Sequence, residues 1–326
     1  MSLKFFKIGN VNIEKSAALA PMASVADVVY RKLCKQFKAS YVVSEMISVK
    51  GICFNEKAME KYMKITQQER PMAIQLFGSD PYYFELALEK VLKFQPDIID
   101  LNMGCPVRKV VRSGAGCKLM TNVKLAEKIV LAVVKHSIVP VTVKIRMGWD
   151  ENSVNALEFS KRMEACGVSA ITIHGRTRSQ FYSGKSDWNF IAKVKQNLKI
   201  PVIASGDVFD AVLAEELYLK SGADLIMVGR GSFGKPWIFY EIYHYLKTGK
   251  LLKEPNFRFK MKVMLKHIKD LCCEYGENSG MKIARFHAIN YFHNFENAAK
   301  FRMRCSKLKK FNDAVNLVNE VLCNIV

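Results

Sequence analysis

The sequence lacks any long apolar run. No stretch reaches the roughly 18 uncharged apolar residues that a membrane-spanning helix needs. The N-terminal segment MSLKFFKIGNVNIEK contains neither an apolar signal core nor a small-residue cleavage site. These two absences lead us to expect a cytoplasmic protein that has no membrane partner.

The sequence also lacks a CxxC pair, although it contains nine cysteines, scattered from Cys34 to Cys323. An odd number of widely spaced cysteines indicates neither a disulfide framework nor a zinc site, and we expect no metal. Most of these cysteines are expected to be small buried apolar residues. A cysteine with a chemical role must therefore be identified from its position.

Acidic residues are scarce relative to basic ones. The 326 residues include 50 Lys+Arg and 30 Asp+Glu, which leaves a net charge of +20. Such an excess favours a polyanionic partner, either nucleic acid or an anionic membrane surface. The alternative is a basic enzyme whose surface lysines are only solvated.

Eight short apolar runs recur along the first 231 residues. Each is mostly apolar on both faces, which is typical of a strand that is buried on two sides. The runs are AALAP (17–21), YVVSEM (41–46), MAIQLFG (72–78), DIIDLNMG (97–104), VTVKIRMG (141–148), AITIHG (170–175), VIASGD (202–207) and LIMVGRG (225–231).

Helical patterns lie between these runs. One begins near Ser79, with a proline in its first turn, and places Phe84, Leu88 and Val91 on one face. Repeated alternation of strand and helix predicts parallel strands with right-handed crossovers. Eight units match a closed (β/α)8 TIM barrel better than an open sheet. A Rossmann domain is disfavoured, since no G-x-G-x-x-G follows the first run.

The pattern changes after Lys250, where only helical periodicity remains. We expect helices over 260–275 and 284–295, and a last one near the C-terminus. From Lys250 onward there are 15 basic and 7 acidic residues, a balance of +8. We therefore expect a barrel domain over 1–248 and a small basic all-α domain over 249–326. Its segment FRMRCSKLKK (301–310) favours nucleic-acid binding, while a tail that only covers the barrel bottom is the alternative.

Catalytic residues of TIM barrels lie on the loops that leave the C-terminal ends of the strands. In this chain those ends are rich in polar and cationic groups. The last two, Ser205-Gly206-Asp207 and Gly229-Arg230-Gly231, lie where such barrels commonly bind phosphate. The other ends carry Pro21, Met22 and Ala23, then Glu45, Gln75, Asn102 with Cys105, Lys144 with Arg146, and His174 with Arg176 and Arg178.

Lys144 lies inside an apolar strand, where a buried ammonium is costly without a partner. A flavin that becomes anionic on reduction would be one, and a carboxylate inside the barrel would be another. The amide of Gln75 suits the mixed donor and acceptor edge of an isoalloxazine ring. His174 is either a phosphate or substrate contact or a core histidine.

Cys105 follows the fourth apolar run on a loop over the barrel mouth. A thiol with a pKa near about 8.5 is mostly protonated at neutral pH and can act as a general acid. Nearby Arg108, Lys109 and Arg112 would lower that pKa and favour a nucleophilic thiolate. Residue types leave both roles open. Cys117 lies closer to the next helix, and we expect a structural role for it.

Taken together, these motifs resemble those of the tRNA-dihydrouridine synthase family, in its FMN-dependent bacterial form. The resemblance runs over nearly the whole chain, in order and spacing. It rests on PMA (21–23), VSEM (43–46), QLFG (75–78), LNMGCP (101–106), KIRMGWD (144–150), IHGRTR (173–178) and VGRG (228–231).

The resemblance implies an FMN-dependent barrel with a tRNA-binding helical domain, which reduces the C5=C6 bond of particular uridines. Cys105 would donate a proton to C5 after a hydride from flavin reaches C6. NADPH or NADH would reduce the flavin again through the same mouth, and we expect a monomer. The implied cofactor contacts are Pro21, Met22, Ala23, Gln75, Asn102, Lys144, His174, Ser205, Gly206, Asp207, Gly229 and Arg230; the implied RNA contacts are Arg108, Lys109, Arg176 and Arg178.

The chain departs from the family pattern at two motifs. It has PMASVAD (21–27) where PMAGVTD is common, and SGD (205–207) where NGD is usual. Both departures bear on cofactor affinity and leave the groups that the chemistry requires. Two other functions stay open: an FMN-dependent barrel acting on a small molecule, such as a dihydroorotate dehydrogenase-like enzyme, and a non-catalytic RNA-binding protein.

Overall fold

The computed structural model describes residues 3–292 and 298–323, and its largest part is a closed barrel of eight parallel strands. The strands pair in the order β10-β3-β4-β5-β6-β7-β8-β9. This confirms the predicted TIM barrel, and each strand coincides with one of the predicted runs. The strands are β3 (Ala17–Leu19), β4 (Tyr41–Ser48), β5 (Met72–Phe77), β6 (Ile98–Met103), β7 (Val141–Arg146), β8 (Ala170–His174), β9 (Val202–Ser205) and β10 (Leu225–Val228).

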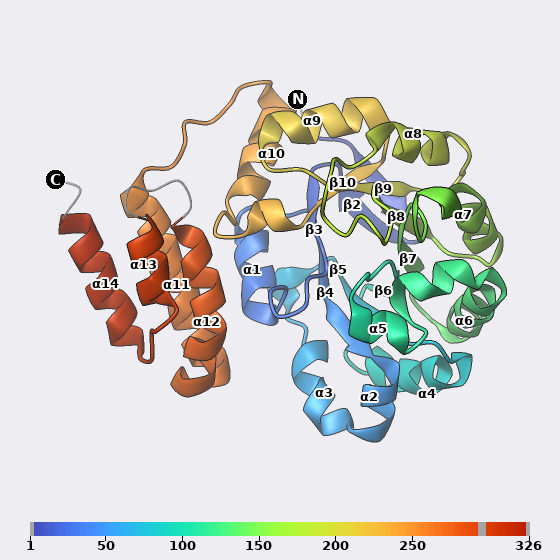
Figure 1. Cartoon of the computed structure of the whole chain (residues 1–326), viewed down its shortest axis with the longest axis horizontal. Helices are drawn as coiled ribbons and strands as arrows, with labels where there is room; N and C mark the ends of the chain where they lie inside the picture. The colour runs from blue at the N-terminus through green and yellow to red at the C-terminus, as the bar shows by residue number, and fades with distance from the viewer. Residues whose placement is uncertain (1–2, 293–297, 324–326) are drawn as a thin grey trace.

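Helices form the outer layer of the barrel (Figure 1). In α4, Asp80 caps the N-terminus and Pro81 occupies the first turn, and Phe84, Leu88 and Val91 are buried against the strands. The outer helices are α1 (Val28–Gln36), α4 (Pro81–Leu92), α6 (Val123–His136), α7 (Ala156–Ala165), α8 (Trp188–Gln196), α9 (Ala211–Ser221) and α10 (Ile238–Thr248). Shorter helices in the loops are α2 (Val49–Phe54), α3 (Glu56–Met63) and α5 (Arg108–Arg112).

A hairpin of β1 (Phe5–Ile8) and β2 (Val11–Glu14) precedes the barrel and was not predicted. Ile8 and Ile13 are fully buried and pack with barrel residues near the N-terminal ends of the strands, so the hairpin closes the barrel bottom. Its turn requires Gly9, which has a φ of +58°, and a Cβ there would lie 2.5 Å from Pro140 Cγ.

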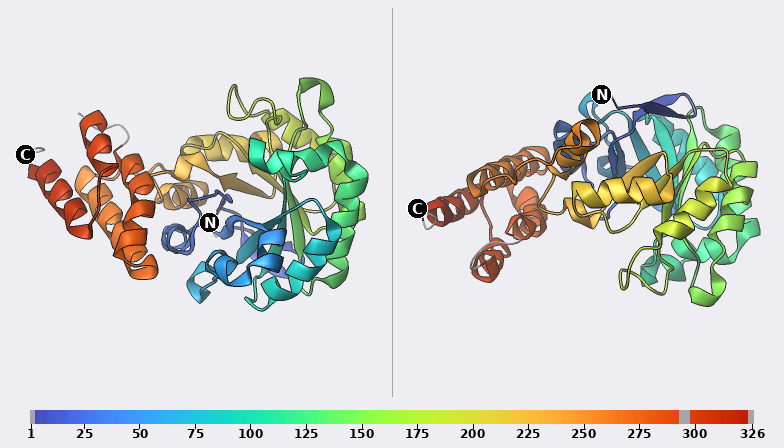
Figure 2. Two further views of the ribbon diagram at one scale, coloured as in Figure 1. Left: turned by 60° about the horizontal axis from the view of Figure 1, so that its bottom comes forward. Right: turned by 90° about the horizontal axis from the view of Figure 1, so that it is seen from above.

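The C-terminal part is all-helical and lies beside the barrel, next to α1 (Figures 1 and 2). It contains α11 (Phe257–Tyr275), α12 (Glu277–Tyr291), α13 (Ala298–Cys305) and α14 (Phe311–Cys323). The predicted helix over 284–295 corresponds to the end of α12, and its residues 293–295 lie outside the described residues. Within the described ranges, no helix has both the length and the apolar character needed to cross a membrane.

The joint between barrel and helices is a buried aromatic cluster. The ring of Tyr30 on α1 lies 5.4 Å from that of His267 on α11 and 5.1 Å from that of His287 on α12, and the two imidazoles lie 4.4 Å apart. Tyr30 also donates a hydrogen bond to the carbonyl of Ser232 at 2.5 Å. The described C-terminal helices are therefore fixed to the side of the barrel, against α1.

Candidate active site

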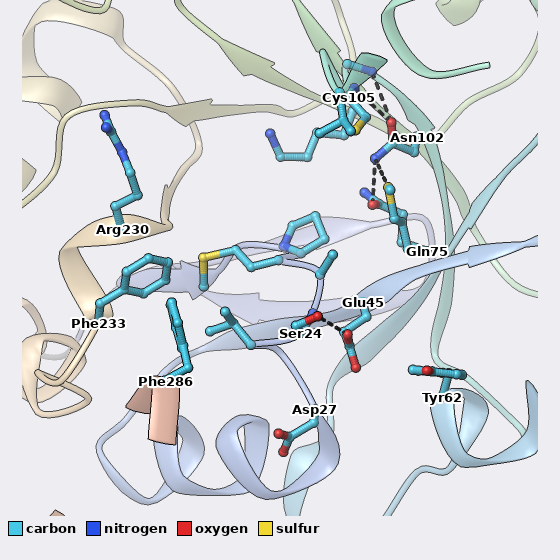
Figure 3. Close-up of a pocket in the computed structure, with 18 of the residues that line it drawn as sticks. Ser24, Asp27, Glu45, Tyr62, Gln75, Asn102, Cys105, Arg230, Phe233 and Phe286 are labelled. Carbon is cyan, nitrogen blue, oxygen red and sulfur yellow. Dashed lines mark hydrogen bonds between the residues drawn. The ribbon is translucent and has the colours of Figure 1, made fainter. Parts of the chain in front are cut away.

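A cavity of about 1000 Å³ opens at the C-terminal ends of the strands. Its wall brings together Cys105 from the loop after β6 and Lys144 from β7. Figure 3 shows Cys105, Asn102 and Gln75 on one side and Arg230 across the opening. The predicted residues that line it are Pro21, Met22, Ala23, Gln75, Asn102, Cys105, Lys144, His174 and Arg230.

Asn102 is the centre of a chain of hydrogen bonds that ends at Cys105. Its side-chain oxygen accepts the backbone N–H of Cys105 at 3.0 Å, and its amide donates to Gln75 Oε1 at 2.8 Å. Gln75 donates to Asp100 Oδ2 at 2.6 Å, and Thr142 donates to Asp100 Oδ1 at 2.6 Å. The side chains of Asn102, Gln75, Asp100 and Thr142 are all buried. The network therefore anchors the cysteine loop to the barrel interior.

Cys105 itself has a half-buried side chain. Burial raises the pKa of its thiol above the ordinary value, while the Val107 backbone N–H and the cations Arg146 and Lys144 lower it by less. Because the net shift is upward, the thiol is protonated at neutral pH. The direction of this pKa shift favours a general acid over a thiolate nucleophile.

The basic residues after Cys105 do not control its titration. Arg108, Lys109 and Arg112 lie on α5 with exposed side chains. The cations that act on the thiol lie on β7 instead, and burial outweighs them. Arg108, Lys109 and Arg112 are not among the causes of the Cys105 pKa shift, since their side chains are exposed to solvent on α5.

Lys144 reaches the cavity from β7. No described residue forms a hydrogen bond or an ion pair with its ammonium. The pKa of Lys144 is lowered to about 8, mainly by burial and then by Arg146, while Asp100 and Cys105 partly oppose the shift. A half-buried ammonium that lines a cavity without a partner among the described residues is suited to an anionic ligand there.

The other end of the cavity carries Arg230 and His174. The guanidinium of Arg230 lies 4.5 Å from the ring centre of Tyr182 and 3.5 Å from Asp207 Oδ1. Burial and the surrounding cations hold the pKa of His174 well below its ordinary value, so its ring is neutral. A neutral imidazole can donate from one nitrogen and accept at the other, beside a permanent cation.

Arg176 and Asp207 support this end from behind. Arg176 is 2% exposed, donates to the carbonyls of Ser183 at 3.0 Å and Gly184 at 2.6 Å, and pairs with Asp207 Oδ2 at 2.7 Å. Arg176 is thus buried with its donors engaged inside the loop, and the Asp207 carboxylate lies between Arg176 and Arg230. The RNA contact of Arg176 and the cofactor contact of Asp207 stay predictions, and neither residue is among those that line the cavity.

The remaining predicted contacts lie at the back of the wall or on the surface. Gly206 has a φ of +125°, and a Cβ there would lie 2.3 Å from Ser186 Oγ, so the turn requires glycine. Arg178 stacks on Trp149, with its guanidinium carbon 4.7 Å from the ring centre. Roles in cofactor or RNA binding stay predictions for Ser205, Gly206, Gly229, Arg178, Arg108 and Lys109.

Sequence reasoning missed much of the cavity wall. Phe286 of α12 meets Phe233 of the barrel edge-on, with ring centres 5.4 Å apart, so the helical part contributes to the cavity. No local signal marks these residues, because only domain docking brings them together. The missed lining residues include Ser24, Val25, Asp27, Lys61, Tyr62, Val107, Tyr182, Phe233, Tyr275, Ser279, Lys282, Ile283 and Phe286.

The fold and the position of the cavity define a TIM-barrel enzyme with its site at the C-terminal ends of the strands. Histamine dehydrogenase from Rhizobium sp. 4-9 has this fold, with a TM-score of 0.61 at 11% identity over 76% of this chain and 48%, about half, of that one. An old yellow enzyme homologue from Zymomonas mobilis has a TM-score of 0.56 at 13% identity, over 78% of this chain and 95% of that one.

Sequence comparison identifies the family. The family model of dihydrouridine synthase (Dus) matches residues 18–325. A probable tRNA-dihydrouridine synthase of Rickettsia conorii is 43% identical over 97% of this chain and 93% of the relative. The tRNA-dihydrouridine synthase B of Pseudomonas aeruginosa is 36% identical over 93% of this chain and 91% of the relative. The chain belongs to the dihydrouridine synthase family of oxidoreductases, which confirms the predicted resemblance and implies a flavin cofactor.

The residues present fit a flavin. The ammonium of Lys144, which has no partner among the described residues, matches the anionic edge of a reduced ring, and the amide of Gln75 lies in the same wall. Arg230 and His174, at the far end, provide a cation and a neutral donor for a phosphate.

Proposed function

We propose that this protein reduces the C5=C6 bond of uridines in tRNA to 5,6-dihydrouridine, with FMN as cofactor and NADPH or NADH as reductant. The names of the relatives support the substrate and the product. The observation that carries the chemistry is the convergence of the Cys105 thiol and the Lys144 ammonium in one cavity.

Two groups of residues would hold FMN. Lys144 and Gln75 would contact the ring, and Arg230 with His174 would bind the phosphate. Bound FMN supplies the hydride that is delivered to C6 of the uracil. The positive side chains at both ends offset the negative charge of the cofactor, which supports tight binding at neutral pH.

Cys105 would complete the reaction as a general acid. Hydride addition at C6 leaves electron density at C5 that takes up a proton, and the thiol is the protonated group beside Lys144. Its pKa is raised by burial, so the proton is present at neutral pH. Asn102 fixes the backbone of the acid through its 3.0 Å hydrogen bond.

The RNA would present its uracil by extrusion from the folded tRNA. Unstacking a base costs a few kcal/mol, which phosphate contacts along a basic surface can offset. The net charge of +20 and the exposed Arg108 and Lys109 on α5 support such contacts. The α12 wall supports a role for the helical part at the cavity itself.

The proposal is tested with purified protein, added FMN, NADPH and an unmodified tRNA transcript. We expect flavin uptake, bleaching of the flavin colour by NADPH, and dihydrouridine in the recovered tRNA. A flavin that is bound and reduced without any dihydrouridine formation in a set of tRNAs would overturn the assignment. NADH in place of NADPH gives the reductant preference in the same assay.

A further inference from the structure

We infer that the cavity contains a second base-binding subsite, which takes a guanine of the same RNA that presents the target uridine. The inference rests on the proposed function, because it assumes RNA at the cavity. Figure 3 shows Ser24, Asp27, Glu45 and Tyr62 grouped away from Cys105 and Asn102. We call this part the junction subsite; its residues are Ser24, Asp27, Glu45, Lys61, Tyr62 and Tyr275.

The junction subsite has acceptor atoms that the protein does not use. Asp27 is 6% exposed and accepts the N–H groups of Val29 and Tyr30 through Oδ1, whereas its Oδ2 is buried without a partner among the described residues. Glu45 accepts the Ser24 N–H through Oε1, and no described residue donates to its Oε2. Asp27 Oδ2 is closed off inside the wall, whereas the half-buried Glu45 lines the cavity, so its Oε2 can accept an N–H group from a ligand.

The two carboxyl groups also exclude one kind of contact. Burial, and to a smaller degree Glu45, raise the pKa of Asp27 to about 6, so the two groups act on each other. The subsite carries two carboxyl groups against the one ammonium of Lys61, a balance that disfavours an RNA phosphate, so the RNA atoms that enter here belong to a base. Tyr275 closes the subsite from the end of α11, and its pKa is raised by burial and by Asp27.

Guanine is the base whose donor pattern fits. Its N1–H and N2–H groups are adjacent and match the two oxygens of the Glu45 carboxylate, and its O6 accepts from an ammonium. Lys61 supplies that ammonium at the same wall, 4.9 Å from the ring centre of Tyr62. The rings of Tyr62 and Tyr275 offer apolar faces for stacking. Uracil has one N–H between two carbonyls and leaves a carboxylate oxygen unpaired.

The subsite is separate from the position of the target base. The target uracil has to reach Cys105 and Lys144, whereas Glu45 and Asp27 lie on β4 and at the start of α1. Ser24, with a φ of +62°, replaces the glycine of the common family pattern and adds a hydroxyl to this wall. The junction subsite would therefore hold a second nucleotide while the first reacts.

The test measures binding of free nucleotides to the full-length protein, without turnover. Guanosine and inosine monophosphate differ only in the N2 amino group, so their affinities are compared by calorimetry with FMN saturating. We expect guanosine monophosphate to bind about fivefold more tightly or better. Glu45→Gln, which keeps an acceptor for the Ser24 N–H, should abolish the difference, whereas Glu60→Gln on exposed α3 should preserve it.

A second variant keeps the test decisive if Glu45→Gln does not fold. Lys61→Met, on the exposed face of α3, should weaken guanosine and inosine monophosphates equally, since both carry O6, and leave adenosine monophosphate unchanged. Equal affinity for the guanosine and inosine nucleotides in the unmodified protein would overturn the inference. So would a preference that survives Glu45→Gln. Because no reduction is measured, either result is distinct from a failure of the proposed reaction.

Discussion

Asn102 holds Cys105 by its backbone: the side-chain oxygen of Asn102 accepts the Cys105 N–H at 3.0 Å, while its amide is fixed to Gln75 at 2.8 Å. The position of the thiol thus depends on a polar chain that continues to Asp100 and Thr142. Neither partner of the central pair can shift without breaking a buried hydrogen bond.

Replacing Asn102 should separate positioning from binding. In Asn102→Ala the Cys105 loop loses its anchor, so the single-turnover rate of uridine reduction should fall about 100-fold, as expected for a group displaced by roughly 1 Å. RNA affinity should stay near the original value. The matched control is Asn197→Ala, whose amide donates only to a local carbonyl at 2.9 Å. An unchanged rate in Asn102→Ala would remove its positioning role.

The RNA contacts predicted on α5 are tested by salt dependence. If Arg108 and Lys109 each neutralise one phosphate, replacing each with Ala should reduce the slope of log affinity against log salt by about 0.7 to 0.9. Arg176→Lys should leave this slope unchanged and weaken FMN binding, because Arg176 supports Arg230 through Asp207. A slope that falls in Arg176→Lys but not in the α5 variants would reverse these assignments.

Removing one partner of the buried ion pair of Arg31 and Glu69 should destabilise the protein strongly. Arg31 Nε lies 2.6 Å from Glu69 Oε1, and both side chains are at most 1% exposed. Arg31→Met leaves the carboxylate without its cation, and the free energy of unfolding should fall by about 3–5 kcal/mol in urea denaturation. Lys220→Met, which breaks an exposed pair with Glu216, should have no measurable effect. Equal stability of the two variants would contradict this account.

The imidazoles of the domain joint should make stability depend on pH. Burial lowers the pKa of His287 to about 3 and that of His267 well below 6.5, so the folded protein keeps both neutral. Below about pH 6.5 the unfolded chain binds protons that the folded chain does not. The free energy of unfolding should therefore decrease as the pH is lowered, by up to about 1.4 kcal/mol per pH unit for each group.

His287→Gln should flatten that dependence between pH 5 and 6.5. Comparing the slopes of variant and unmodified protein cancels the opposite contributions of Asp27 and Asp100, whose pKa values are raised. Urea denaturation at several pH values supplies the slopes. Identical slopes would show that the joint opens and hydrates its imidazoles before unfolding.

The barrel was predictable because its strands have a simple local signature. The run VTVKIRMG was expected over 141–148, and β7 spans Val141–Arg146. Strands buried on both faces are apolar throughout, and this signal survives without tertiary information. The β1–β2 hairpin was missed because it is short and interspersed with lysine. Its Ile8 and Ile13 become core residues only when the hairpin packs beneath the barrel.

The site was predictable where a residue lies at a strand end, and less so elsewhere. Cys105, Asn102 and Lys144 were found because barrel geometry assigns those ends to the mouth. The direction of the Cys105 pKa shift was not predictable from the sequence. Arg108 is close to Cys105 in sequence, but its side chain is exposed to solvent on α5. Tyr275 and Phe286 were missed because they reach the cavity only through docking of the C-terminal helices.

The central claim is that the thiol of Cys105 is the acid of uridine reduction, and its most direct test is Cys105→Ala in a single-turnover assay. FMN and tRNA binding should persist while dihydrouridine formation slows at least about 100-fold. Cys117→Ala, which alters a fully buried thiol of the same loop, should keep most of the rate. Dihydrouridine formation at the original rate in Cys105→Ala would contradict the account.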